Sequence, residues 1–151
     1  MAELFHHIEI DRAPELVFDV ATDPTRFAEW QPDVTGARWV EGNPREVGAT
    51  YESTRRIGGF EVTQTQRVSE NDPPHRWAVS GSTDGPISAN ATVAVEPLDN
   101  GTRSRVTFTL DLEGPGIGRL MVPQVRRMAA KVAPKSHRRL KELLESQDSK
   151  A

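Results

Sequence analysis

The sequence has 151 residues, a formal net charge of −3 and no cysteine. This length is typical of a single domain that can bury a core without cross-links. The absence of cysteine excludes disulfides, thiolate zinc sites and catalytic thiols, and the mild acidity argues against general affinity for nucleic acid.

Neither a membrane span nor a signal peptide is expected. No apolar run approaches the roughly 20 residues that a spanning helix needs, and the first residues lack the basic and apolar regions of a signal peptide. We therefore expect a cytoplasmic protein with one domain over residues 1–146 and a loose C-terminal tail over residues 147–151.

The first part of the chain predicts one strand followed by two short helices. Residues 5–10 alternate weakly, as in a strand. Pro14 suits the first turn of a helix, where its missing N–H leaves no partner unsatisfied. Asp23 is a good N-cap for the second helix, on which Phe27 and Trp30 face the same side.

The middle of the chain has an apolar period of two, which predicts consecutive antiparallel strands. Turns are expected where Gly-Gly and Asp-Asn-Gly occur, because glycine and asparagine accept positive φ. The strands are expected at residues 34–40, 49–57, 60–69, 77–82, 87–96 and 105–112, with these turns at 58–59 and 99–101.

The last part of the chain has a helical period. Apolar residues recur at steps of three and four from Ile117 to Leu144, opposite a basic face. This pattern predicts one amphipathic helix of roughly 25–30 residues, which Pro123 and Pro134 should start or kink locally. A sheet of about seven strands must curl, so we expect an α+β fold in which a curved antiparallel sheet wraps around the long helix.

Several motifs carry a resemblance to a known family. Ile-Asp-Arg-Ala-Pro-Glu-Leu-Val-Phe stands at 10–18, and Thr-Asp-Pro at 22–24 precedes Trp-Gln-Pro at 30–32. Asp-Pro-Pro-His-Arg stands at 72–76 and Arg-Leu-Lys-Glu-Leu-Leu-Glu at 139–145. The sequence resembles the polyketide cyclase/dehydrase-like branch of the START/Bet v 1 (SRPBCC) superfamily over nearly its whole length. This resemblance implies a helix-grip fold with a cavity for a small hydrophobic molecule.

The resemblance leaves three functions open, because this superfamily has no shared catalytic motif and includes carriers, receptors, aromatase/cyclases and co-chaperone domains. The protein could carry a hydrophobic, polyketide-like or lipid-like ligand, or catalyse a cyclase/dehydrase reaction without metal or cofactor. It could also bind another protein, which would need an exposed apolar patch of several hundred Å². We expect no nucleic acid partner and a monomer or homodimer. Convergence of polar residues inside the cavity would favour an enzyme.

The cavity is expected between the sheet and the long helix, with Trp30 at one end. Arg55 could hold a carboxylate or an enolate-like oxygen, and Gln64 and Gln66 could hydrogen-bond a ligand carbonyl or hydroxyl. A register error of one residue would instead turn these side chains to solvent. No catalytic residue is assigned, and the candidate cavity residues are Trp30, Tyr51, Ser53, Arg55, Gln64, Gln66, Trp77, Ala89, Ala91, Phe108, Met121, Val125 and Met128.

The four histidines show no metal-ligand spacing, so no metal is expected. Histidine suits proton transfer at neutral pH, but without partners at ligand spacing surface positions are favoured. His6 and His7 are expected at an exposed strand edge, His75 in a turn and His137 close to the basic face of the helix.

Overall fold

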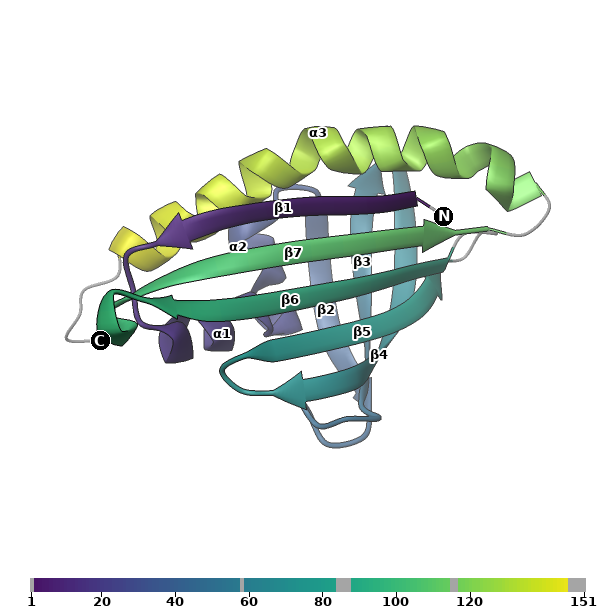
Figure 1. Ribbon diagram of the computed structural model, residues 1–151. Coiled ribbons are helices and arrows are strands. Elements are labelled where there is room, and N and C mark those ends of the chain that lie inside the picture. Colours follow the sequence, from purple (N-terminus) through teal and green to yellow (C-terminus); the bar gives the residue numbers. More distant parts are fainter. Residues whose placement is uncertain (1, 58, 84–87, 115–116, 147–151) are drawn as a thin grey trace.

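A computed structural model describes residues 2–57, 59–83, 88–114 and 117–146 (Figure 1). The expected residue Ile87 and the tail at 147–151 lie outside these ranges. In chain order the elements are β1 (Ala2–Ile10), α1 (Pro14–Ala21), η1 (Pro24–Arg26), α2 (Phe27–Trp30), β2 (Val34–Glu41), β3 (Thr50–Ile57), β4 (Phe60–Asp72), β5 (Arg76–Thr83), β6 (Ser88–Leu98), η2 (Asp99–Gly101), β7 (Arg103–Glu113) and α3 (Ile117–Ser146).

The seven strands form one antiparallel sheet in the order β1-β7-β6-β5-β4-β3-β2. Strands β2 to β7 follow one another along the sheet, and β1 is added at the far side of β7 with Ala2 opposite Leu112 and Ile10 opposite Ser104. The expected α+β helix-grip fold is therefore confirmed. The sequence underestimated several strands by up to three residues, since β1 begins at Ala2, β4 continues to Asp72 and β7 spans Arg103–Glu113.

The sheet is strongly curved. Figure 1 shows β1, β7 and β6 running across β2, β3 and β4, so that the two ends of the sheet face each other. The pairing register shifts between Val68 and Glu70 and twice along β2. An extra residue in one strand bends it and increases its twist, so these irregularities help the sheet to close around its inner face.

The short helices close one end of the curved sheet. Pro14 occupies the first turn of α1, and the carboxylate of Asp23 accepts a hydrogen bond from the Thr25 N–H at 3.0 Å, as expected of an N-cap. The segment contacts β2 through η1 and α2, and β6 and β7 through α1. It therefore links the two ends of the sheet on its concave side.

The turn at Asp99–Gly101 has the backbone that its sequence predicts. Asp99, Asn100 and Gly101 all have positive φ, at 49°, 60° and 83°. Asparagine, aspartate and glycine tolerate this conformation better than other residues do. The turn joins β6 to β7, whose paired residues form the longest unbroken register in the sheet.

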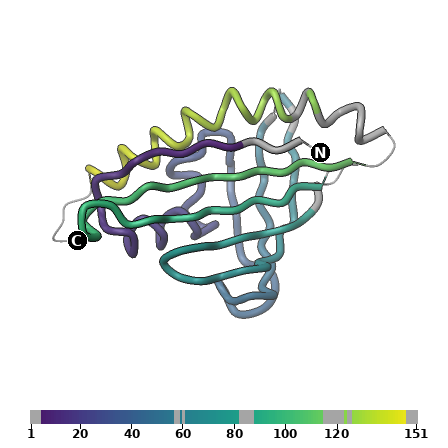
Figure 2. Tube along the Cα trace, in the orientation of Figure 1, coloured from purple at the N-terminus to yellow at the C-terminus, as the bar shows by residue number. Residues whose placement is uncertain are grey.

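The long helix α3 lies along β1 and β7 and also contacts α2. Figure 2 shows the purple N-terminal strand beside the yellow-green C-terminal helix, although they are the two ends of the chain. The helix continues through Pro123 and Pro134. Its basic face is exposed at Arg126, Arg127, Lys131, Lys135 and Arg138. Within the described residues, no helix is both long enough and apolar enough to cross a membrane.

The C-terminal end of α3 is fastened to the rest of the core. Leu140 and Leu144 are fully buried in a cluster that includes Ile10, Val17 and Val106. Polar contacts surround this cluster: the Asp11 N–H donates to the Glu145 carboxylate at 2.8 Å, and the Lys141 ammonium donates to the Glu9 carbonyl at 2.8 Å. This end of the helix is therefore held to β1 by both apolar and polar contacts.

Truncation of Leu140 should destabilise the protein strongly. We expect Leu140→Ala to lower the free energy of unfolding by about 2–5 kcal/mol, because it leaves a cavity among fully buried neighbours. Urea denaturation followed by circular dichroism measures the change. Leu16→Ala on α1, where the side chain is 37% exposed, is the control and should cost less than about 1 kcal/mol. Equal losses in both variants would contradict this account of the core.

Candidate ligand-binding site

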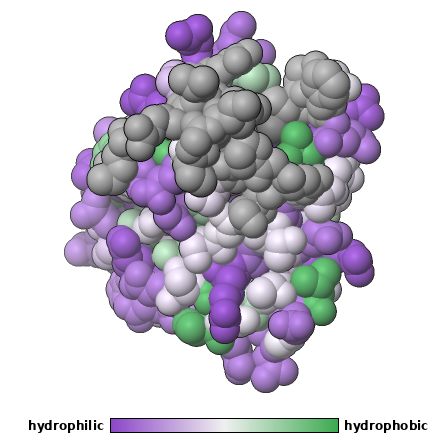
Figure 3. Space-filling model, turned by 90° about the vertical axis from the view of Figure 1, so that its right-hand side faces the viewer, coloured by the Kyte–Doolittle hydropathy of each residue, from purple (hydrophilic) through white to green (hydrophobic). Residues whose placement is uncertain are grey.

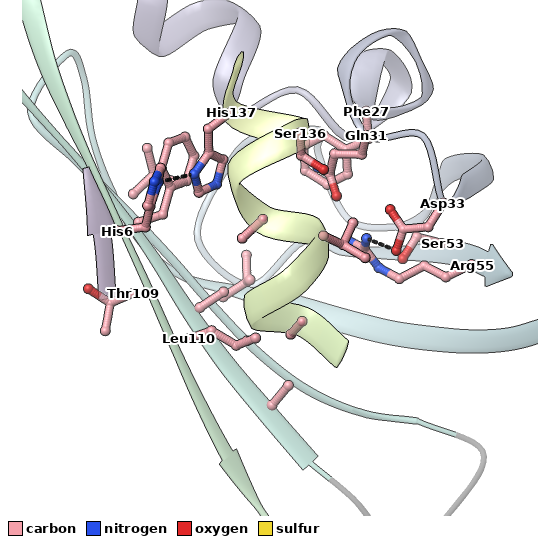
Figure 4. Close-up of a pocket in the computed structure, with 18 of the residues that line it drawn as sticks. His6, Phe27, Gln31, Asp33, Ser53, Arg55, Thr109, Leu110, Ser136 and His137 are labelled. Carbon is pink, nitrogen blue, oxygen red and sulfur yellow. Dashed lines mark hydrogen bonds and ion pairs between the residues drawn. The ribbon is translucent and has the colours of Figure 1, made fainter. Parts of the chain in front are cut away.

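A cavity of about 410 Å³ lies between the sheet, the short helices and α3. Its walls come from nearly every strand and from the middle of the long helix (Figure 4). This volume is within the range of small-molecule sites, roughly 300–1,000 Å³. Most of the wall is apolar, and Phe27, Trp30, Tyr51, Trp77 and Phe108 are among its aromatic members.

These five aromatic side chains form one continuous cluster centred on Phe27. The ring of Phe27 meets Trp30, Tyr51 and Trp77 edge to face, with centroids 5.8, 6.0 and 6.5 Å apart. Edge-to-face and offset contacts are the favoured geometries for aromatic pairs. Because Phe27 and Trp30 come from α2 whereas Tyr51 and Trp77 come from β3 and β5, this cluster fixes the short helix against the sheet.

Two neighbouring strands supply a large part of the polar wall. Tyr51, Ser53 and Arg55 alternate along β3, and Tyr51 is opposite Gln66 while Ser53 is opposite Gln64 on β4. All five line the cavity. Residues separated by two share a face of a strand, so the sheet brings this polar set together on its concave side rather than in solvent.

Arg55 is held by a carboxylate that the sequence analysis did not select. Its guanidinium donates to the Asp33 carboxylate at 3.0 Å, and both side chains are about one-fifth exposed, at 23% and 19%. The Arg56 N–H also donates to the Asp33 carbonyl at 2.7 Å. Asp33 lies just after α2, far from Arg55 in sequence, so only the folded chain shows this ion pair.

Some polar atoms of the cavity wall have no hydrogen-bond partner within the described residues. They include Nε1 of Trp30 and Oε1 of Gln66, whose side chains are 3% and 7% exposed. A buried polar group without a partner costs about 1–3 kcal/mol. Gly81 leaves the space that β4 and Gln66 occupy, because a Cβ there would lie 2.0 Å from the Thr65 carbonyl oxygen and 2.9 Å from Gln66 Oε1.

The hydroxyl of Tyr51 adds a donor to the same wall. Burial raises the pKa of Tyr51 well above its usual range, while the positive charge of Arg55 acts in the opposite direction. The phenol therefore keeps its proton at neutral pH. Tyr51 is 3% exposed, and no hydrogen bond to its hydroxyl is formed within the described residues.

The middle of α3 forms the opposite wall with small side chains. Ala129, Ala130 and Ala133 line the cavity together with Met128 and Val132. Alanine at these positions leaves space that leucine fills further along the helix, at Leu140 and Leu144. The side chains of Met121 and Val125, two of the expected cavity residues, lie outside the described residues.

Apart from those two, the structure places every candidate residue of the sequence analysis in the cavity wall. Trp30, Tyr51, Ser53, Arg55, Gln64, Gln66, Trp77, Ala89, Ala91, Phe108 and Met128 all line it. The wall also contains residues that were not selected, among them Phe27, Gln31, Asp33 and Ser136.

The predictions for His6 and His137 are wrong. Both line the cavity, and His137 is only 6% exposed rather than close to the basic face. Their Nδ1 atoms are 2.5 Å apart (Figure 4). A signal was present in the sequence: His6 alternates with Ile8 and Ile10, and His137 precedes Leu140 and Leu144 by three and seven residues. His7 is exposed, as expected.

Burial affects the titration of both rings. It is the main cause that lowers the pKa of His137 to about 3, and the nearby His6 adds to this shift. Burial also lowers the pKa of His6, with His7 as the second cause. His137 is therefore neutral at physiological pH. No group of three or more histidines and carboxylates among the described residues is arranged to hold a metal ion.

The comparisons with known proteins agree with this architecture. The model of the family "Polyketide cyclase / dehydrase and lipid transport" matches residues 1–145. The chain belongs to this family. No curated protein matches the sequence.

Several solved structures have the same fold as this chain. It is similar to a START superfamily protein from Mycobacterium smegmatis, with a TM-score of 0.77 and 16% identity over 95% of this chain and 97% of that chain. The di-domain ARO/CYC protein BexL of the BE-7585A biosynthetic pathway gives a TM-score of 0.77 and 18% identity, over 96% of this chain and 47% of that chain. A protein from Chromobacterium violaceum gives 0.70 and 18%, over 97% and 100%. The TM-scores establish a shared fold, and at identities this low they establish nothing further.

The Arg55–Asp33 ion pair should contribute measurably to the stability of the protein. A double-mutant cycle with Arg55→Met and Asp33→Ala should give a coupling energy of about 1–3 kcal/mol, because the pair is charged and partly shielded from water. Urea denaturation provides the four free energies. The control is the exposed pair Arg56–Glu61 on the same two strands that carry the polar wall, at 3.7 Å, for which we expect less than about 1 kcal/mol. Equal coupling in both pairs would contradict a shielded site.

The buried His137 should make stability depend on pH. Its pKa in the folded protein, about 3, is below the ordinary value of 6.5, so between these values the unfolded chain binds more protons. Stability should therefore be complete above about pH 6.5 and fall as the pH decreases, by at most about 1.4 kcal/mol per pH unit from this group.

Urea denaturation at several pH values, for the wild type and His137→Gln, measures this contribution. The variant should lose less stability than the wild type between pH 6.5 and pH 4. His75→Gln, in the turn between β4 and β5, is the control and should retain the wild-type slope. A His137→Gln variant with an unchanged slope would show that the ring is not held neutral by burial.

Proposed function

We propose that this protein binds a small, mainly apolar molecule in the cavity between the sheet and α3. The observation that carries the proposal is the combination of a cavity of about 410 Å³ with buried polar side chains in its wall that have no partner among the described residues. Empty cavities that persist in proteins are usually apolar throughout. Polar groups in an otherwise apolar wall are typical of ligand sites, where they fix the orientation of the bound molecule.

The wall suggests which ligand would fit. The aromatic cluster offers flat apolar surfaces, which favour a planar or fused-ring body. Tyr51 and Arg55 supply donors for a carbonyl or an anionic oxygen, and Gln66 supplies an acceptor for a hydroxyl. A molecule with an aromatic body, a carbonyl group and a hydroxyl group would therefore match both the shape and the polarity of the site.

Catalysis is the second candidate function. Tyr51, Arg55, Gln64 and Gln66 converge on one wall of the cavity, and a pure carrier of apolar molecules has no need of such a set. Hydrogen-bond donors aimed at a carbonyl oxygen stabilise the negative charge that develops there during enolisation. The family includes cyclases and dehydrases by its description, and this convergence favours activity of that class.

The interaction-module hypothesis receives less support. The large apolar side chains exposed within the described residues are Phe5, Leu16, Val40 and Val47, which come from four separate segments. Figure 3 shows one face of the molecule, on which the hydrophobic groups are separated by hydrophilic ones. A protein-binding surface would need a continuous apolar patch.

Native mass spectrometry of the protein purified from its own host tests whether the cavity is occupied. An adduct that is retained under native conditions and lost on denaturation would support a bound ligand and give its mass.

Binding of 6-hydroxy-2-acetonaphthone, a fused ring with one carbonyl and one hydroxyl, is then measured by quenching of tryptophan fluorescence.

The variant Tyr51→Phe should weaken binding of this naphthone by about 5- to 10-fold, the equivalent of one lost hydrogen bond. It should leave binding of 6-ethyl-2-naphthol, which lacks the carbonyl, unchanged. Trp39→Phe is the control, because Trp39 packs against Tyr51 at 5.6 Å between ring centroids without lining the cavity. Binding that no cavity substitution affects, together with the absence of an adduct, would overturn the proposal.

A further inference from the structure

The pair of histidines at one end of the cavity is built from the two ends of the chain. His6 lies on β1 and His137 on α3, 131 residues apart, and their Nδ1 atoms are 2.5 Å apart. His137 stacks on Phe108 with ring centroids 3.8 Å apart and an angle of 13° between the planes. Trp30 lies on another side of the same ring, at 6.4 Å between centroids. These contacts fix the position of the imidazole.

The hydrogen bond between the two rings determines which atoms carry protons. One Nδ1 must donate and the other must accept, so at least one ring is neutral. When Nδ1 of His137 donates to His6, Nε2 of His137 carries a lone pair. Within the described residues, Nε2 has no hydrogen-bond partner and is not shut off by neighbouring atoms. Since His137 lines the cavity, this lone pair is available to a bound molecule.

The surroundings keep His137 neutral, so that a ring nitrogen can accept a proton. The titratable groups of β1 near it are His6 and His7, and both act to keep protons away, His6 on His137 and His7 on His6. On its own helix, Arg138 and Arg139 are exposed, and Phe108 of β7 and Trp30 of α2 carry no charge. A neutral imidazole with a free nitrogen in an apolar wall is a general base.

We propose that His6 and His137 form a proton-transfer dyad for the molecule bound in the cavity, an inference that rests on the proposed function. Nε2 of His137 removes a proton from a carbon next to a carbonyl group, and the electrons of that C–H bond move to the carbonyl oxygen. The same nitrogen returns the proton to carbon, where the enolate electrons form a new C–H bond, or to a hydroxyl group on the β-carbon. In the second case the enolate electrons form a C=C bond, the C–O bond breaks and water leaves. His137 is the catalytic residue, and His6 is a positioning residue that sets its tautomer.

The opposite side of the cavity supplies the complementary chemistry. Figure 4 shows His6 and His137 on one side of α3 and the Asp33–Arg55 pair on the other. The donors Tyr51 and Arg55 can stabilise negative charge on oxygen. Trp30, whose ring lies beside His137, has an N–H with no partner among the described residues. A base at one end and oxyanion donors elsewhere in the same cavity form the arrangement that enolisation requires.

The base can be tested without knowledge of the natural ligand by using 5-nitrobenzisoxazole as the probe. A single base removes the proton from carbon 3, the N–O bond breaks, and the product is a coloured cyanophenolate, so atoms and charge balance without a further reactant. The wild type should show saturable turnover. His137→Gln should lower kcat by about 100-fold, the typical contribution of a general base, with little change in KM.

The variant His6→Leu tests the positioning role. It should lower kcat less than His137→Gln does. It should also move the midpoint of the rate–pH profile upward, because His6 no longer opposes protonation of His137. A merely structural role of His6 would leave this midpoint unchanged. His75→Gln, exposed in the turn between β4 and β5, is the control and should behave as the wild type does.

Binding of the probe is measured separately by quenching of tryptophan fluorescence, so that two failures can be distinguished. A probe that binds and is converted equally fast by the wild type and His137→Gln would overturn the dyad alone. A probe that does not bind would overturn the accessible cavity and, with it, both proposals.

Nitrogen-15 NMR of the histidine rings in the wild type provides a measurement that needs no variant. A neutral His137 with its proton on Nδ1, beside a neutral His6 with its proton on Nε2, supports the dyad, and the reverse pair of tautomers or two charged or freely exchanging rings contradict it.

Discussion

The fold depends on the way in which α3 is fastened across the concave side of the sheet. Its C-terminal end buries Leu140 and Leu144 among Ile10, Val17 and Val106, and Asp11, Glu9 and Lys141 add polar contacts around them. Nearer its middle, the same helix presents alanines to the sheet. The C-terminal part of α3 therefore stabilises the fold through its packing, and the middle of α3 spans a space that its side chains do not fill.

This division explains why the polar residues of the cavity can be retained. In an apolar enclosure, a hydrogen bond or a charge interaction is stronger than in water, and an unpaired polar group is more costly. Arg55 is compensated by Asp33, Tyr51 and His137 are kept neutral by burial, and a bound molecule would supply partners for the rest. The groups that would recognise a ligand are thus also the groups that would act on it.

Much of the fold could be read from the chain because it follows from local rules. The period of two from Val34 onward, the Asp23 cap and the period of the last helix all describe interactions between residues near in sequence. The alternation on β3 and β4 even placed Arg55, Gln64 and Gln66 on one face. The prediction failed for His6 and His137, because each histidine was considered alone and its phase with neighbouring apolar residues was not used.

The sequence by itself determined the order and type of the elements and the polar composition of two adjacent strands. Only the tertiary structure decided that β1 pairs with β7, that Asp33 holds Arg55 and that His6 meets His137. The physical reason is distance along the chain: periodicity and capping act over a few residues, whereas these contacts join segments up to 131 residues apart. They exist only once the curved sheet and the long helix have closed around a common cavity.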